Sequence, residues 1–158
     1  MLMKGKAYRT MVQLVLLGAF ICVCQITTAQ TSNDFSRLEF KTGQSGVVIT
    51  GKVEHCTYPS ETNTEFDYLL ISIANNNDFP VEVQFDKVPY INAECKNCTE
   101  PKDREFTVLK TLKPGEKISG KCERTQGNSL RSFVAMSQHV TKRMTHFRIE
   151  NLEVTPKR

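Results

Sequence analysis

The sequence predicts an all-β antiparallel sandwich of about seven to eight short strands. After residue 34, apolar residues repeatedly alternate with polar ones, as in strands that bury one face. Turn-forming residues separate these segments at intervals of roughly ten residues. No segment shows the apolar spacing of an amphipathic helix. We therefore expect a single β-sandwich domain over residues 35–156.

The 158-residue chain begins with the three-part pattern of a cleavable signal peptide. Three basic residues lie within the first nine, an apolar stretch runs from Leu14 to Cys24, and small residues end at Ala29. A membrane-spanning helix needs roughly 20 apolar residues, and this stretch is shorter. We expect residues 1–29 to be removed on export, residues 30–34 to form a flexible leader, and the mature chain to have no transmembrane segment.

The charge of the mature chain argues against nucleic acid as a partner. Residues 1–29 hold three of the 21 basic residues and none of the 17 acidic ones. Without them the formal net charge falls from +4 to +1. A nearly neutral domain creates no strong field that would attract a polyanion.

Two strands are expected before residue 58. Phe35, Leu38 and Phe40 suggest a short first strand, and Gly43–Gly46 supplies turn residues. The segment 47–54 then alternates apolar and polar residues and is rich in β-branched side chains. This composition favours a strand with one buried face.

The stretch Phe66–Phe85 is the most strongly patterned part of the chain. Tyr68–Ile73 is an apolar run of strand length without a charge, which suits a strand covered on both faces. Asn75–Asp78 favours a turn, because Asn and Asp tolerate left-handed backbone. After Pro80, apolar residues 81, 83 and 85 alternate strictly with polar ones. We expect these two strands to be partners in a sheet.

Residues 105–122 are expected to form a hairpin. Apolar and polar residues alternate up to residue 112 and again from residue 118 to Cys122. Between them, Lys113–Glu116 places Pro114 and Gly115 at the two central positions of a type II turn.

Two further strands are expected near the C-terminus. Phe133–Met136 is a short apolar run that we interpret as another central strand. In the last strand, residues 147 and 149 share one parity, whereas apolar residues 152 and 154 have the other. A bulge near Glu150–Asn151 would restore the register.

Two turn motifs carry a resemblance to a known class of domain. The segments I-A-N-N-N-D-F-P-V-E-V at 73–83 and L-K-P-G-E at 112–116 resemble small exported bacterial domains with an immunoglobulin-like sandwich. The resemblance implies an immunoglobulin-like fold and a periplasmic or extracellular location. It identifies no functional residue.

Four cysteines remain after residue 29, at positions 56, 95, 98 and 122. An even number in an exported chain indicates disulfides, with three possible connectivities. The polar Asn92–Arg104 segment, called the 92–104 loop below, has few apolar residues to hold it. We predict a bridge from this loop to the sheet, with Cys122 as the partner. A bridge between Cys95 and Cys98 is the competing arrangement.

The cysteines also allow two other chemistries. Cys95-Lys96-Asn97-Cys98 has the spacing of a thioredoxin-type redox motif, but no amphipathic helix follows it, and Glu94 disfavours a thiolate at Cys95. A structural zinc site takes two closely spaced pairs, whereas Cys56 and Cys122 are isolated. Neither a cofactor nor a metal is therefore expected.

Other chemistry-bearing residues fit no known motif. The three histidines at 55, 139 and 146, together with Met136 and Met144, have no familiar ligand spacing. The chain lacks the Gly-x-Ser-x-Gly motif of many hydrolases. Lys142, Arg143 and Arg148, with His139 and His146, form a basic cluster that suits either a solvated connection or an anionic glycan.

These observations predict an exported, non-enzymatic β-sandwich with a binding or structural role at the cell envelope. A protein or glycan partner would meet the 92–104 loop, because loops on rigid scaffolds carry recognition. The candidate residues there are Asn92, Lys96, Asn97, Lys102 and Arg104. The alternatives are a thiol–disulfide enzyme and a metal-binding periplasmic protein, both using Cys95 and Cys98.

Overall fold

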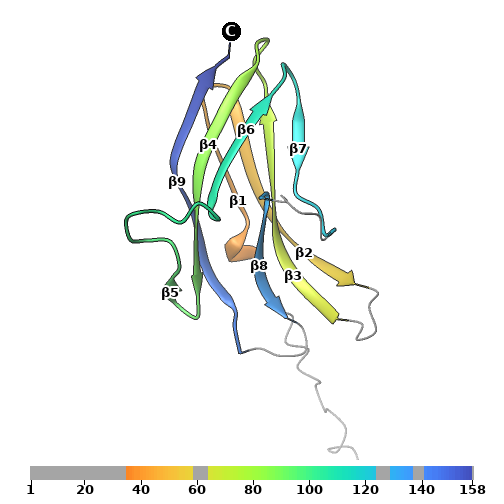
Figure 1. Cartoon of the computed structure of the whole chain (residues 1–158). Coiled ribbons are helices and arrows are strands. Elements are labelled where there is room, and N and C mark those ends of the chain that lie inside the picture. The colour runs from red at the N-terminus through yellow and green to blue at the C-terminus, as the bar shows by residue number, and fades with distance from the viewer. Residues whose placement is uncertain (1–34, 59–63, 124–128, 137–140, 158) are drawn as a thin grey trace, which may run out of the picture. The chain divides into compact units, whose positions relative to one another are not determined.

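The computed structural model describes residues 35–58, 64–123, 129–136 and 141–157. They belong to one compact unit, Asp34–Arg158. The expected signal peptide (1–29) and leader (30–34) lie outside the described residues. Within the described residues there are nine strands and a single 3₁₀ turn, without an α-helix. The prediction of an all-β antiparallel fold is confirmed (Figure 1).

The elements are η1 (Ser36–Leu38), β1 (Phe40–Gln44), β2 (Val47–Tyr58), β3 (Thr64–Asn75), β4 (Val81–Ile91), β5 (Glu94–Cys95), β6 (Thr107–Leu112), β7 (Lys117–Ser119), β8 (Arg131–Met136) and β9 (Met144–Pro156). None of the described residues belongs to a helix of the length and hydrophobicity that crossing a membrane requires.

The first sheet is built around β3. Strand β2 pairs with β3 along its whole length, and β1 pairs with β2. On its other edge, β3 pairs with two short strands in succession, β8 near its start and β7 near its end. Ile71 lies between them and continues the ladder through hydrogen bonds with Gly120 and Leu130.

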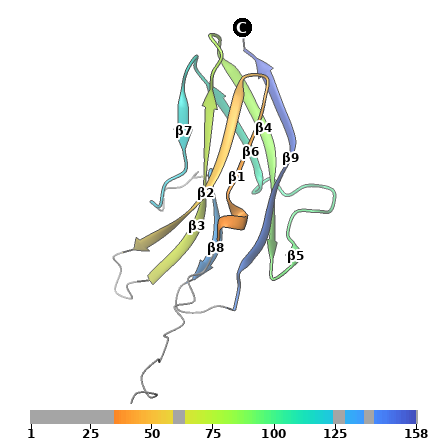
Figure 2. The same ribbon diagram turned by 180° about the vertical axis from the view of Figure 1, so that it is seen from behind.

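The second sheet repeats this plan around β4. Strand β9 pairs along the full length of β4. On the other edge β6 pairs with the first half of β4, and β5 pairs with its last two residues. Figures 1 and 2 show the long strands β4 and β9 side by side. The part of the 92–104 loop that follows β5 projects from this sheet before the chain enters β6.

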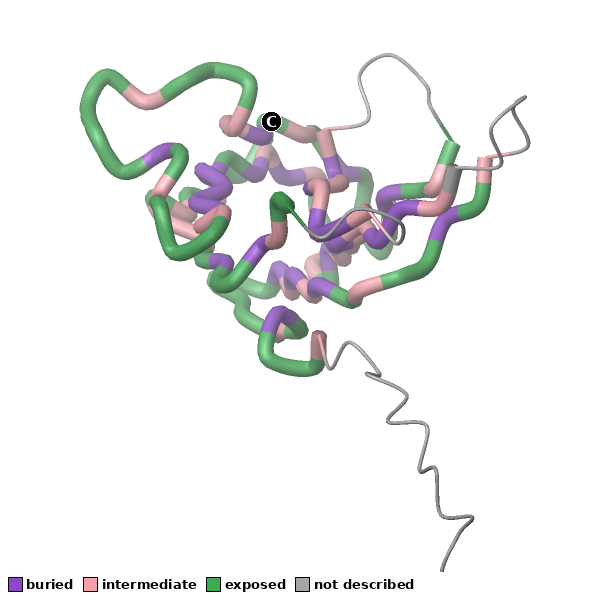
Figure 3. The backbone as a smooth tube through the Cα atoms, turned by 90° about the horizontal axis from the view of Figure 1, so that it is seen from below, coloured by how far each residue is buried: buried purple, intermediate pink, exposed green. Residues whose placement is uncertain are grey.

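One hydrophobic core joins the two sheets. Its fully buried side chains come from alternate positions of the two central strands and from their neighbours. They include Leu69, Ile71 and Ile73 of β3 and Val81, Val83 and Phe85 of β4. Buried positions gather on the inner sides of the strands, and exposed ones lie at the periphery (Figure 3). The alternation in the sequence therefore identified the inward face of β4. For β3 the apolar run predicted a strand covered on both faces, whereas the structure buries only alternate residues and leaves Tyr68, Leu70 and Ser72 half-buried.

The pairing predicted for two strand pairs is wrong. Strands β3 and β4 are not partners, and β6 and β7 do not form a hairpin, because each turn connects one sheet to the other. The turns themselves are present: Gly115 has a φ of 66°, and the Glu116 N–H donates to the Lys113 carbonyl at 3.1 Å. Asn75 holds the two connections together, since its Nδ2 donates to the carbonyls of Phe79 and Lys113, each at 2.9 Å.

The first predicted strand, the place of β8 in its sheet and the predicted bulge in β9 have different outcomes. Phe35–Leu38 is not part of a strand: the Leu38 N–H donates to the Phe35 carbonyl at 2.8 Å and closes a 3₁₀ turn. Strand β8 is not central, because among the described residues it pairs only with β3. The bulge predicted near Glu150–Asn151 is confirmed by a register shift between β4 and β9 and by a φ of 51° at Asn151.

Candidate functional site

Each sheet has one interrupted edge, and the two interrupted edges line the same groove. In the first sheet the interruption is the segment between β7 and β8, and in the second it is the 92–104 loop. Residues from both segments line a groove of about 590 Å³. The loop and the groove are therefore parts of one region.

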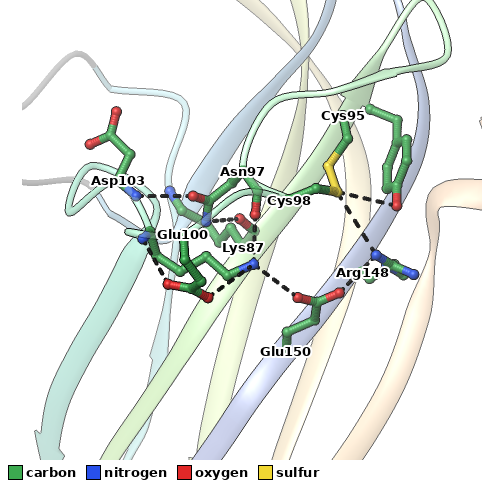
Figure 4. The surroundings of a disulfide bond; sticks show 10 residues. Lys87, Cys95, Asn97, Cys98, Glu100, Asp103, Arg148 and Glu150 are labelled. Carbon is green, nitrogen blue, oxygen red and sulfur yellow. Dashed lines mark hydrogen bonds and ion pairs between the residues drawn. A yellow bond between two sulfur atoms is a disulfide. The ribbon is translucent and has the colours of Figure 1, made fainter.

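Asn97 anchors the 92–104 loop to the sheet. Its side chain is only 3% exposed. The Nδ2 donates to the Lys87 carbonyl of β4 at 3.1 Å, and the Oδ1 accepts from the Asp103 N–H at 3.0 Å (Figure 4). A loop that has few apolar residues is thus held by a buried amide.

Lys102 provides the second anchor. Its Nζ donates to the Asn97 carbonyl at 2.9 Å and to Glu150 of β9 at 3.2 Å. Glu150 also pairs with Arg148 at 2.7 Å (Figure 4). Two of the five candidate residues, Asn97 and Lys102, therefore hold the loop in place.

The other candidate residues lie at the surface. Asn92 bonds the connection before β9, where its Nδ2 donates to the Thr141 carbonyl and its Oδ1 accepts from the Arg143 N–H. Lys96 pairs with Glu94 at 2.7 Å and also lines the groove. The Arg104 side chain is exposed. Lys96 and Arg104 are therefore the candidates whose charges remain accessible.

The structure contains the disulfides Cys56–Cys122 and Cys95–Cys98. The predicted bridge from the loop to Cys122 is wrong, and the competing arrangement is present. Cys56 of β2 is buried and reaches the segment that follows β7, across β3. The loop needs no covalent link to the sheet, because Asn97 and Lys102 already fasten it there.

Cys98 lies in a polar setting. The residue is exposed, and its Sγ is 3.5 Å from the Tyr90 hydroxyl and 4.0 Å from Nη2 of Arg148 (Figure 4). A guanidinium and a hydroxyl beside a sulfur stabilise its thiolate form. The negative charge expected to disfavour this chemistry, Glu94, is paired with Lys96 instead.

Lys87 is the most unusual group in the groove. It continues the inward parity of Val81, Val83 and Phe85 along β4 and is only 5% exposed. Its Nζ crosses to the first sheet, where it donates to the carbonyls of Ser129 at 3.0 Å and Arg131 at 3.4 Å. Burial lowers the pKa of Lys87 below its usual value of 10.5, and the nearby Glu105 carboxylate offsets part of this lowering.

Two hydroxyls beside Lys87 make no hydrogen bond. The Oγ atoms of Ser129 and Ser132 are buried and have no partner among the described residues. An unsatisfied buried hydroxyl is unfavourable by roughly 1–3 kcal/mol. Such groups in a native fold call for a specific explanation.

Aromatic side chains form another wall of the groove. Tyr68 and Phe133 contact each other edge to face, with ring centroids 6.2 Å apart. The Arg131 guanidinium stacks over the Tyr68 ring at 4.8 Å, and its Nη1 donates to the Tyr58 hydroxyl at 3.0 Å. Phe106 and Met144 complete the apolar lining.

The two histidines that the structure describes do not converge. The Nδ1 of His55 lies 2.9 Å from Oδ1 of Asp67, and His146 contacts the Tyr90 ring. His139 is outside the described residues. Among residues that the structure describes, no group of three or more His, Cys, Asp or Glu is arranged to hold a metal ion. In the basic cluster, Arg143 stacks on Phe35, and Arg148 pairs with Glu150.

Comparison with protein-family models, with curated proteins and with solved structures finds no match to this chain. The site is therefore interpreted from its own residues. Sequence reasoning named the loop but missed Lys87 and Ser132. The parity of β4 carried a signal for Lys87, because position 87 continues the inward series of 81, 83 and 85.

Proposed function

We propose that this chain is an exported, non-enzymatic β-sandwich that binds a protein or glycan partner at the cell envelope through the 92–104 loop. Export accords with the N-terminal pattern at residues 1–29 and with the two disulfides, which persist in oxidising compartments. The turn motifs at 73–83 and 112–116 support an immunoglobulin-like sandwich. The resemblance also suggests a bacterial source.

The anchoring of the loop is the observation that carries this proposal. Asn97 and Lys102 fasten it from inside, while Glu94, Lys96 and Arg104 face outward. A preorganised loop loses little conformational entropy when it binds, so its exposed side chains can contribute to affinity.

The test compares two double charge reversals that keep the net charge constant. The loop variant combines Glu94→Lys with Arg104→Glu and retains both anchors. The control combines Glu39→Lys with Lys41→Glu, two exposed residues at the β1 end of the first sheet. We expect envelope material from cells that make the protein to retain at least tenfold less of the loop variant than of the unmodified protein. The control should be retained as well as the unmodified protein is. Equal retention of both variants would contradict the proposal.

Location is tested separately, by fractionating these cells and sequencing the N-terminus of the purified protein. We expect an exported chain that begins at Gln30. A protein that remains in the cytoplasm with Met1 intact would exclude export.

A second candidate function, thiol–disulfide exchange, is favoured by the surroundings of Cys98. In this reaction a substrate dithiol is oxidised to a disulfide while Cys95–Cys98 is reduced to two thiols. Arg148 would stabilise the Cys98 thiolate. Metal binding by the same pair would require prior reduction of the bridge, because thiolates are the ligands.

Insulin reduction by a dithiol reductant tests this second function. Activity that falls in Cys98→Ser and Arg148→Gln but not in Arg143→Gln would support it. No activity above the uncatalysed rate would exclude it.

A further inference from the structure

We propose that the groove between the two interrupted edges binds a small organic carboxylate. The acid group would lie at Lys87, Ser129 and Ser132, and a ring or apolar body would lie against Phe106, Phe133 and Met144. This inference goes beyond the proposed function, which concerns the outer surface of the 92–104 loop, and does not depend on it.

The ammonium of Lys87 points to an anion. An ammonium has three protons, and the described residues give this one only two acceptors, both neutral carbonyls. No carboxylate among the described residues lies within ion-pair distance of it, and Glu105 acts only through its field. Buried charges in proteins are normally paired. A ligand carboxylate would supply both the missing acceptor and the missing counter-charge.

The unpartnered hydroxyls are an independent observation at the same place. Ser129 and Ser132 flank Arg131 on one short segment, and the Lys87 Nζ bonds that segment. Ser132 is 9% exposed. Since no hydrogen bond holds either hydroxyl in its present rotamer, each can turn about χ1 toward a ligand. A carboxylate has about four lone-pair sites and can accept from all three donors.

The lining favours one negative charge rather than two. The charged side chains that line the groove are three cations, Lys87, Lys96 and Arg131, and one carboxylate, Glu105. That carboxylate would repel a dianion in a partly desolvated groove more strongly than a monoanion. The aromatic and Met side chains suit a ring or apolar body, and the volume of about 590 Å³ lies in the usual range for small-molecule sites.

The experiment is an NMR titration of the oxidised protein, purified after export, with sodium benzoate and with its uncharged analogue benzamide. We expect benzoate to shift the backbone amides of residues 87, 106 and 129–133 saturably, with a Kd of about 1 mM or tighter. Benzamide should bind at least tenfold more weakly, because it brings no charge to Lys87. Glucuronate in place of benzoate tests whether the body can be a sugar ring rather than an aromatic one, and saturable binding of either supports the carboxylate site.

Two variants locate the binding. Lys87→Met keeps an unbranched side chain that is one atom shorter and removes the charge, and should weaken benzoate binding at least tenfold. Ser132→Ala removes a hydroxyl without breaking any hydrogen bond among the described residues, and should weaken binding severalfold. Lys41→Met, at an exposed position on β1, is the matched control and should bind as the unmodified protein does.

Several outcomes would overturn the proposal. These are equal affinities for benzoate and benzamide, unchanged benzoate binding in both Lys87→Met and Ser132→Ala, or no saturable shift with either carboxylate. Tighter binding of inorganic phosphate at the same amides would overturn the assignment to a carboxylate. None of these results depends on the behaviour of the loop variant, so the two proposals fail separately.

Discussion

Lys87 starts on β4 of the second sheet, and its ammonium bonds two carbonyls of the first. The side chain therefore connects the sheets where their edges are interrupted. Burial makes the charged form unfavourable, and for that reason the pKa is lowered. The stability of the domain should depend on whether this one group is protonated.

We expect this dependence to be visible as pH rises. Between the lowered pKa in the folded state and the usual 10.5 in the unfolded state, only the unfolded chain holds the proton. The contribution of Lys87 to stability therefore increases with pH through that window, and below the window the penalty of burying the charge is present in full. Lys87→Met has no proton to lose. The free energy of unfolding of Lys87→Met relative to the unmodified protein should thus fall as the pH is raised from 7 to about 11.

Urea unfolding of both proteins at several pH values measures this difference, and other titrating groups cancel in the subtraction. A difference that stays constant would show that the pKa of Lys87 is the same in both states, and one that grows with pH would show that folding raises this pKa. Either result would contradict the prediction.

Asn97 has the opposite character, because its buried amide is fully used. Asn97→Asp keeps the oxygen that accepts from the Asp103 N–H but replaces the donor to the Lys87 carbonyl by a second oxygen. We expect a loss of about 1–3 kcal/mol in the free energy of unfolding, together with faster amide hydrogen exchange at residues 98–104. Asn92→Asp, on the exposed side of the loop, is the control and should change stability by less than about 0.5 kcal/mol.

Some residues of the candidate site could be predicted from the sequence and others could not, and the chemistry of each residue explains the difference. Asn97 and Lys102 could be predicted as site residues because they lie in a long polar segment that also contains two closely spaced cysteines. Lys87 was missed because a charged residue after an alternating strand is usually taken as the end of the strand, whereas β4 continues to Ile91. The unpartnered state of Ser132 depends on contacts with distant residues, and local sequence carries no signal for it.

The positions of the strands could be predicted from neighbouring residues, whereas their pairing depends on residues far apart in the sequence. Alternation located β2, β4, β6 and β9, since a strand's two faces are encoded in neighbouring residues, and an apolar run of strand length located β3. The predicted pairings of β3 with β4 and of β6 with β7 were wrong, because the members of each pair lie in different sheets. A Pro-Gly or Asn-rich turn reverses the chain equally well within one sheet or between two, so turn chemistry alone cannot decide. In the structure Asn75 bonds both connections between the sheets, through the carbonyls of Phe79 and Lys113.

The two disulfides should differ in their contribution to stability, because they close loops of very different length. Cys56 and Cys122 are 66 residues apart, whereas Cys95 and Cys98 are three apart. Loop-closure entropy gives about 4 kcal/mol for the first bridge and about 2 kcal/mol or less for the second. We expect Cys56→Ala with Cys122→Ala to lower the free energy of unfolding far more than Cys95→Ala with Cys98→Ala.

Denaturant unfolding of the two double variants measures both losses. The Cys95/Cys98 variant should also keep slow hydrogen exchange at the Asp103 N–H, which donates to the Asn97 side chain, since this anchor is independent of the bridge. A larger loss from the short bridge would mean that the loop depends on covalent closure rather than on Asn97 and Lys102.

At the scale of the domain, the two sheets share one plan: a long central strand, a full-length partner on one edge and two short strands on the other. The core and the groove share Met144, whereas Lys87, Ser129 and Ser132 line the groove and lie outside the core cluster. Substitutions at these three polar residues can therefore alter binding without removing a core side chain.

A single core also predicts a single folding unit. The core cluster takes side chains from both sheets, and the compact unit Asp34–Arg158 contains every described strand. We expect residues 34–158, oxidised, to unfold in urea in one transition that coincides by far-UV circular dichroism and by tyrosine fluorescence. Because β3 pairs with β8 and β4 with β9, contacts that are far apart in sequence must form before either sheet is complete. Refolding should therefore fall in the millisecond-to-second range typical of such β topologies. Two separate transitions would mean that the sheets unfold independently, and that the groove between them is an interface between units rather than a feature of one.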